Sequence, residues 1–171
     1  MATRPVAEPR SGCPINVAVE VIGDHWSLLV LRDIMFAGRR NFRVLQELSE
    51  EGIASNILAD RLKRLVSAGL LTREDAGRGR RVTYSLTEAS IRLVPVMAAL
   101  GEWGYTNRKT ARPHRARSEV LVAGGPVLWE DFMADLRTIH LGAPPPPGDG
   151  PTATERMAAA YDAAIAREEP E

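Results

Sequence analysis

The spacing of apolar residues predicts a helix near the start of the chain. Ile15, Val19 and Ile22 recur at i, i+4 and i+7, which places them on one helical face. Pro14 suits the first position of this helix, because its missing N–H would be unpaired there in any case. Cys13 then falls at or next to the N-cap.

A second helix is predicted over about 26–36, and its broad apolar face makes it a central element of the core. Arg32 and Asp33 are expected on its wetter side. The apolar face is formed by Leu28, Leu29, Leu31, Ile34 and Met35.

The next stretch has the pattern of a short helix, a turn and a longer helix. Phe42, Leu45 and Leu48 stand at i, i+3 and i+6, which predicts two helical turns, and Asn41 is a favourable N-cap. Gly52 supplies the bend that follows. A basic helix is expected over about 55–67, with Ser55 as its cap, Gly69 at its end, and a buried seam of Leu58, Leu62 and Leu65.

Two strands are predicted after this second helix, over 70–74 and 82–86. The connection 75–81 holds two glycines and three arginines, which is typical of a charged hairpin tip. A helix–turn–helix followed by a hairpin is the plan of a winged helix-turn-helix. The predicted fold is therefore mainly α with a small antiparallel β-hairpin (α+β).

The remaining residues predict further helices on either side of a spacer. A long helix opens at about Thr87 and should be kinked by Pro95, and its apolar surface is wide enough to meet a second chain. The segment 106–117 has the composition of a linker or a frayed helix end. An amphipathic helix over 126–141 and an Ala-rich helix over 152–167 follow.

These patterns divide the chain into three predicted parts. Residues 1–12 form a disordered arm, residues 13–108 form the winged-helix domain, and residues 109–171 form a C-terminal helical extension. A Pro-rich spacer over 143–151 interrupts the extension.

The distribution of charge along the chain is more informative than the net charge. The 171 residues carry 22 Lys and Arg against 22 Asp and Glu, so the net charge is zero. Residues 1–110 hold 16 basic and 12 acidic residues, whereas residues 111–171 hold 6 and 10. A basic first part and an acidic tail fit a DNA-binding body. The chain has no apolar run of about 20 residues and no signal peptide, which together with the single Cys13 predicts a cytoplasmic protein with no membrane partner.

The basic helix and the hairpin tip carry the predicted chemistry. A recognition helix offers polar and cationic side chains to base edges and phosphates in the major groove. Cations on the wing can reach phosphates or a narrow minor groove. Arg61 has an alternative role, since it could pair with Asp60 or Glu47. The candidate DNA-binding residues are Arg39, Arg40, Ser55, Asn56, Arg61, Lys63, Arg64, Arg78, Arg80 and Arg81.

No other chemistry is predicted. The three histidines are far apart, and no Cys/His cluster has metal-ligand spacing, so we expect no metal, cofactor or enzymatic activity. Trp129, Phe132 and Tyr161 could line an effector pocket in the extension. Alternatively, the extension packs on the core or enlarges a dimer interface.

The chain resembles the HxlR family of bacterial winged-helix transcriptional regulators over about residues 13–104. The matching anchors are Cys13-Pro14, Gly23-Asp24-His25-Trp26-Ser27, Leu31-Arg32, Gly38 to Phe42, Gly52-Ile53, Leu58, Arg61-Leu62, Leu65, Gly69-Leu70, Tyr84-Ser85-Leu86-Thr87, Pro95 and Trp103-Gly104. The chain departs from the family pattern at His25, at Ser90, and in a wing without prolines.

The resemblance implies a homodimer whose interface is formed by the N- and C-terminal helices. The two recognition helices of this dimer would bind one double-stranded DNA operator, often to repress a gene. It also implies that Cys13 is a candidate redox sensor for a thiol-reactive or small-molecule effector, since a thiol at a helix N-terminus lies at the positive end of the helix dipole. The alternatives are an inert, packed thiol and, for the whole chain, a protein-interaction module that does not bind DNA.

Overall fold

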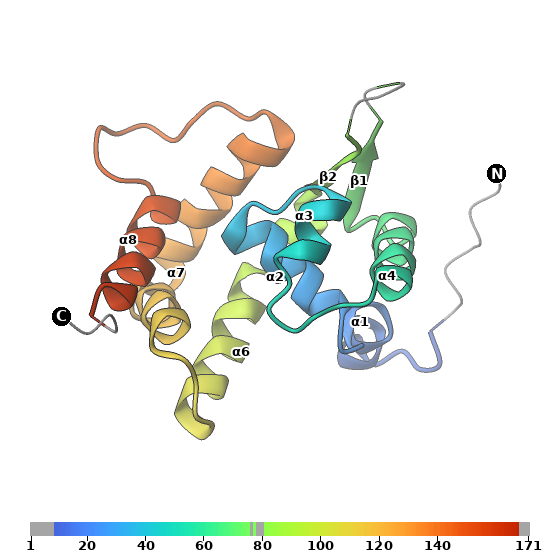
Figure 1. The fold of residues 1–171 in the computed structure, drawn as a ribbon, viewed down its shortest axis with the longest axis horizontal. Coiled ribbons are helices and arrows are strands. Elements are labelled where there is room, and N and C mark those ends of the chain that lie inside the picture. Colours follow the sequence, from blue (N-terminus) through green and yellow to red (C-terminus); the bar gives the residue numbers. More distant parts are fainter. Residues whose placement is uncertain (1–8, 76, 78–80, 168–171) are drawn as a thin grey trace. The chain divides into compact units, whose positions relative to one another are not determined.

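A computed structural model describes residues 9–75, 77 and 81–167 (Figure 1). Within these residues the chain forms eight helices and two strands. It divides into two compact units, residues 1–90 and residues 91–171.

The first unit begins with helices α1 (Pro14–Ile22) and α2 (Ser27–Ala37). Cys13 is the N-cap of α1, as predicted. The apolar face of α1 is largely exposed: Ile22 is buried, whereas Ile15 is 74% exposed and Val19 is 55% exposed. Helix α2 confirms the prediction of a core element, with Val30, Leu31, Ile34 and Met35 buried.

The helix–turn–helix consists of α3 (Phe42–Glu47) and α4 (Ser55–Ser67). The predicted cap on α3 is confirmed, since the Asn41 side chain accepts a hydrogen bond of 3.1 Å from the Val44 N–H. The predicted cap on α4 is wrong. Ala54 is the N-cap and makes no side-chain bond, so Ser55 is the first helical residue. Leu48 is exposed because α3 ends one residue before it.

The turn between these helices is fixed by local hydrogen bonding and by backbone conformation. Gly52 has a φ of 68°, in the left-handed region that favours glycine. The Ile53 N–H donates to the Ser49 hydroxyl over 3.2 Å, and the Ile53 side chain is buried as the apolar plug of the turn. The seam of α4, made by Leu58, Leu62 and Leu65, is fully buried as predicted.

The wing is an antiparallel pair of strands, β1 (Leu71–Glu74) and β2 (Thr83–Leu86). Leu71 stands opposite Leu86, and Glu74 stands opposite Thr83. The N–H of Tyr84 in β2 donates to the carbonyl of Arg40 over 2.7 Å, which ties the wing to the segment before α3. The order α3, α4, β1, β2 confirms the winged helix-turn-helix fold.

Pro95 begins a helix and does not kink one. The structure has a one-turn helix α5 (Glu88–Ile91) and a separate helix α6 (Val94–Asn107), with Pro95 in the first turn of α6. Proline is tolerated in a first turn, because the N–H that it lacks would have no partner inside the helix. The prediction of one kinked helix from Thr87 is therefore wrong.

The second unit continues with a long helix, α7 (Arg112–Leu141). It includes residues 112–117, which sequence analysis assigned to a linker or frayed end. Pro113 again lies in the first turn, and Arg115 pairs with Glu119 one turn on over 2.7 Å. Gly125, with φ 57° and ψ −156°, is non-helical and kinks α7.

Helix α8 (Ala153–Ile165) packs against α7 and closes the second unit. Thr152 and Glu155 form a reciprocal capping box at its start. Asp135 of α7 is buried and accepts two hydrogen bonds from Thr154, 2.8 Å from its N–H and 2.9 Å from its hydroxyl. The start of α8 is thereby attached to α7. The spacer 143–151 between these helices contains neither helix nor strand.

In the first unit, the carboxylate of Asp24 connects the α1–α2 turn to α4. It accepts hydrogen bonds from the Trp26 and Ser27 N–H groups, each 3.0 Å, and from the Ser27 hydroxyl. Its Oδ2 also lies 3.2 Å from Nη1 of Arg61 on α4. The pair is close in distance but lacks hydrogen-bond alignment, since Nε and Nη1 of Arg61 are buried without a hydrogen-bond partner. Asp24 is therefore mainly a charge neighbour of Arg61.

These contacts determine how Asp24 titrates. Partial burial raises the pKa of the carboxyl group, but the hydrogen bonds from Ser27 and Trp26 and the charge of Arg61 together lower the pKa below its ordinary value of 3.8. A carboxyl group with a depressed native pKa stabilises the fold at pH values above its unfolded pKa. This stabilisation is lost as the pH falls through the native pKa.

We therefore expect Asp24→Asn to reduce the free energy of unfolding at pH 6 by about 1–2 kcal/mol, because charge-assisted hydrogen bonds are removed. The difference between wild type and variant should shrink as the pH falls below 3.8. Urea denaturation at pH 6 and at pH 3 measures both quantities. Glu74→Gln, which removes an exposed carboxylate from β1, is the control. A difference that stays constant with pH would show that the Asp24 charge is not involved.

Candidate nucleic-acid interface

Helix α4 has one buried face and one polar, exposed face. The leucine seam attaches it to the first unit, so the side chains opposite the seam are directed to solvent. Several of these can donate or accept hydrogen bonds. The exposed polar residues of α4 are Ser55, Asn56, Asp60, Lys63, Arg64 and Ser67.

The predicted cations of α4 fall into two groups. The side chains of Lys63 and Arg64 are exposed and form no ion pair or hydrogen bond with the described residues. Arg61 has a side chain only 17% exposed, with Asp60 at 3.0 Å and Asp24 at 3.2 Å. The intramolecular pairing with Asp60, considered as an alternative from sequence, is therefore what the structure contains. Among the predicted cations of α4, Lys63 and Arg64 are therefore available to bind an external anion.

The turn before α4 is held by a network of charges centred on Asp33 of α2. Asp33 is 7% exposed and accepts hydrogen bonds from Arg32, at 2.7 and 2.9 Å, and from Arg39, at 3.0 Å. Arg32 also donates two hydrogen bonds, of 2.6 and 2.9 Å, to Glu51 in the turn. The network joins α2, the segment before α3, and the turn between α3 and α4.

Sequence analysis missed this network by placing Asp33 on the wetter side of α2. Burial of Asp33 is tolerated because two guanidinium groups neutralise it. The signal present in the sequence was the position of Asp33 next to Arg32 and six residues before Arg39. Burial lowers the pKa of Arg32, but the hydrogen bonds to Glu51 and Asp33 raise it by more, so the guanidinium remains charged.

Arg39 and Arg40, which sequence analysis proposed for phosphate contact, are engaged within the first unit. Arg39 pairs with Asp33 and lies 3.9 Å from Glu50. Arg40 donates to the Tyr84 carbonyl over 3.3 Å and to the Ser85 hydroxyl, so its guanidinium attaches to β2. Both side chains are partly buried. Their observed contacts position the helix–turn–helix and the wing.

The wing tip is described only in part. Arg81 is exposed at the start of the returning segment, whereas the other two predicted tip arginines, Arg78 and Arg80, lie outside the described residues. At the other end of the tip Arg73 pairs with Asp75 over 3.2 Å, and both are exposed. The described part of the wing therefore offers Arg81 as a cation in addition to those of α4.

The described residues hold neither a metal-binding group nor a single helix that could span a membrane. The described residues contain no group of three or more His, Cys, Asp or Glu placed to hold a metal ion. Nor is any single helix of the described part long and apolar enough to cross a membrane. Only α1 and α2 taken together meet that test, and they are bent by 78°.

This arrangement suits the reading of a DNA groove. An α-helix with an exposed row of short polar and cationic side chains fits the major groove, and a hairpin beside it can contact the backbone. Asn56 can bind adenine through two hydrogen bonds, and Lys63 and Arg64 can bind phosphate or guanine. The buried network at Asp33 fixes the helix that presents them.

Several known proteins are similar to this chain in sequence or in fold. The HxlR-like helix-turn-helix family matches residues 21–112. An uncharacterized HTH-type transcriptional regulator of Mycobacterium tuberculosis, Rv3095, is 32% identical over 120 residues, covering 68% of this chain and 74% of that protein. The regulator YybR of Bacillus subtilis is 29% identical over 112 residues, covering 65% and 88%.

A solved structure agrees with these matches. The crystal structure of PA1607, a candidate transcription factor, has a TM-score of 0.55 and 34% identity, covering 61% of this chain and 72% of that one. The family match covers more than half of the chain and includes the whole helix–turn–helix and wing. The chain therefore belongs to the HxlR-like helix-turn-helix family and is a transcriptional regulator of the helix-turn-helix type.

Proposed function

We propose that this protein is a homodimeric, sequence-specific DNA-binding repressor in which α4 enters the major groove of an operator. The observation that carries the proposal is the exposed polar face of α4, on which Asn56, Lys63 and Arg64 are directed to solvent while the neighbouring arginines are paired internally. Ser55 lies on the first turn of the same helix and Arg81 on the wing. Family membership supports DNA as the partner.

Pairing within the protein reduces the number of residues that we propose to contact DNA. Arg39, Arg40 and Arg61 already bind carboxylates, a carbonyl or a hydroxyl of the protein, so we assign them to positioning. We assign the direct contacts to Ser55, Asn56, Lys63, Arg64 and Arg81. Arg78 and Arg80 join Arg81 in this assignment on the basis of sequence alone.

Replacing Lys63 and Arg64 together with Ala should weaken operator binding about tenfold or more. The dependence of log K on log salt concentration should also become shallower, by about one unit for each phosphate that the variant no longer neutralises. Fluorescence anisotropy with DNA from the promoter of the protein's own gene, over 50–200 mM salt, measures both quantities.

Arg156→Ala, which removes an exposed cation from α8, is the matched control and should leave both quantities unchanged. If the double variant behaves like this control, α4 is not the reading helix. If the folded wild type fails to bind at low salt, the DNA-binding proposal is wrong and the alternative of a protein-interaction module gains support.

The dimer is supported by exposed apolar residues on two helices. Trp103 of α6 is 58% exposed, and α1 has an equally unusual apolar surface. Large apolar side chains that a helix leaves exposed are typical of an interface. The residues proposed to meet the partner are Ile15, Val17 and Val19 on α1, and Val96, Leu100 and Trp103 on α6.

Introducing Glu at both Leu100 and Trp103 should raise the dimer dissociation constant at least about thirtyfold, because two charges would be buried in an apolar contact. Sedimentation equilibrium measures the constant, and circular dichroism checks that the helices remain folded. Glu102→Gln, on another side of α6, should have no effect. A folded double variant that dimerises like wild type would place the interface elsewhere.

Cys13 is proposed as a sensor of oxidants or electrophiles. It is the only cysteine, it is exposed, and it stands at the N-cap of α1. With one cysteine per chain, the available products are a disulfide between subunits, a mixed disulfide or an adduct.

Diamide should lower the operator affinity of the wild type and should not change that of Cys13→Ser. Anisotropy before and after treatment measures the response, and a non-reducing gel identifies any disulfide between subunits. Restoration by dithiothreitol is the control for irreversible damage. A response retained in Cys13→Ser would exclude Cys13 as the sensor.

A further inference from the structure

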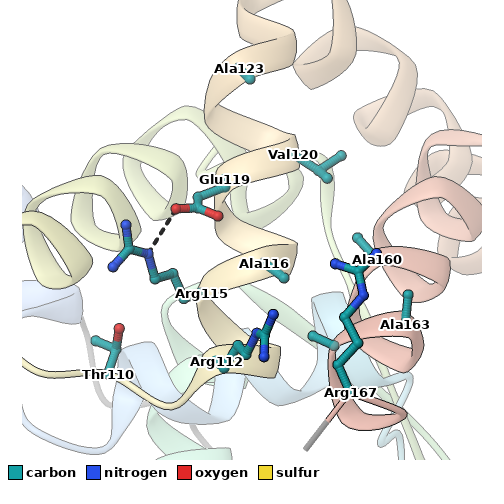
Figure 2. A pocket seen from close by; sticks show the side chains of 11 residues that line it. Thr110, Arg112, Arg115, Ala116, Glu119, Val120, Ala123, Ala160, Ala163 and Arg167 are labelled. Carbon is teal, nitrogen blue, oxygen red and sulfur yellow. Dashed lines mark hydrogen bonds and ion pairs between the residues drawn. The ribbon is translucent and has the colours of Figure 1, made fainter.

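The second unit contains an open groove between the first half of α7 and the face of α8 that packs beside it (Figure 2). Its volume is about 790 Å³, which lies in the range of small-molecule sites. Every lining residue belongs to the second unit, between Thr110 and Arg167. The groove is therefore separate from the helix–turn–helix and the wing.

The walls of the groove are apolar and made of small side chains. Ala116 and Ala123 contribute from α7, and Ala160, Ala163 and Ala164 contribute from α8, with Val120 beside them. Methyl groups leave space between two packed helices that larger side chains would fill. A ligand seated there would therefore contact hydrocarbon along its length.

Cations stand around these walls. In Figure 2 the side chains of Arg112 and Arg167 extend toward the groove from the two helices, whereas Arg115 is joined to Glu119. Arg112 and Arg167 form no ion pair or hydrogen bond with the described residues, while Arg115 is held by Glu119 at 2.7 Å. Within the described part of the chain these two guanidinium groups have no partner, and Thr110 adds a hydroxyl to the lining.

The aromatic residues that sequence analysis considered for an effector pocket have other roles. Phe132 is fully buried, and the indole N–H of Trp129 donates to the Leu121 carbonyl over 2.9 Å. Tyr161 meets the ring of His114 and the guanidinium of Arg117. None of the three lines this groove.

We propose that this groove binds a small amphipathic organic acid, with its carboxylate between Arg112 and Arg167 and its apolar body along the alanine walls. Charge selects an anion, since the lining carries three arginines and one glutamate. Guanidinium groups bind carboxylates with paired, charge-assisted hydrogen bonds. The alanine walls select an apolar body over a fully hydrated anion. The site does not depend on DNA binding, and its test uses no DNA.

The probe is octanoate, added to the full-length protein below its micellar concentration and followed by isothermal titration calorimetry. Octylammonium has the same chain and the opposite charge, and octan-1-ol has the chain without a charge. We expect octanoate to bind at least about tenfold more tightly than either, because a charge-assisted hydrogen bond contributes a factor of this size. Equal binding of the three probes would overturn the proposal.

Variants locate the binding. Replacing Arg112 and Arg167 together with Ala should weaken octanoate binding about tenfold or more, whereas Arg156→Ala, on α8 outside the groove, should not. Ala163→Phe fills the groove from an exposed position and should weaken octanoate binding while both arginines remain. If octanoate binds the double arginine variant and Ala163→Phe as it binds the wild type, the anion binds elsewhere and the proposal fails. Circular dichroism confirms that each variant is folded.

Discussion

The geometry of the first unit depends on the ion pairs that the buried carboxylate of Asp33 forms. It lies on the central helix α2 and binds the guanidinium groups of Arg32 and Arg39. Arg32 extends the contact to Glu51, in the turn that leads into α4. A buried charge without its partner destabilises a protein by about 3–5 kcal/mol, so each member holds the others in place. The direction in which α4 leaves the turn is determined by this set of contacts together with the leucine seam.

The network also explains which arginines are available for an external partner. A chain of zero net charge that binds a polyanion must keep some cations away from its own carboxylates. In this chain, paired and unpaired cations lie close together. Arg32, Arg39 and Arg61 pair with acidic residues and Arg40 binds β2, whereas Lys63 and Arg64 meet no described carboxylate. The paired arginines orient the helix, and the free cations are left on the surface that it presents.

Sequence reasoning succeeded where a local rule decides the structure. Asn41 caps α3, Gly52 adopts a left-handed conformation, and the seam of α4 is buried, because each follows from short-range geometry or helical periodicity. It failed where a distant partner decides. Nothing near Arg40 in the sequence reveals that its guanidinium is attached to Tyr84 and Ser85 of β2. Asp33 is another case, because its partners Arg32 and Arg39 are near in sequence but helical periodicity does not show that they neutralise a buried carboxylate. Pro95 was misjudged for a different reason, since proline has opposite effects inside a helix and in its first turn.

The candidate site in the second unit could not be predicted from the sequence either. Residues 111–171 carry more acidic than basic residues, and composition alone therefore predicts a surface that repels anions. Folding separates these charges. Asp135 of α7 is buried against the start of α8, Glu119 is paired with Arg115, and Glu155 belongs to a capping box, so three carboxylates are occupied by structural contacts. Arg112 and Arg167 are far apart in sequence and yet line one groove, because α8 packs against α7. An acidic segment can thus present a cationic groove, since the charge that a ligand meets is set by which side chains the fold leaves without a partner.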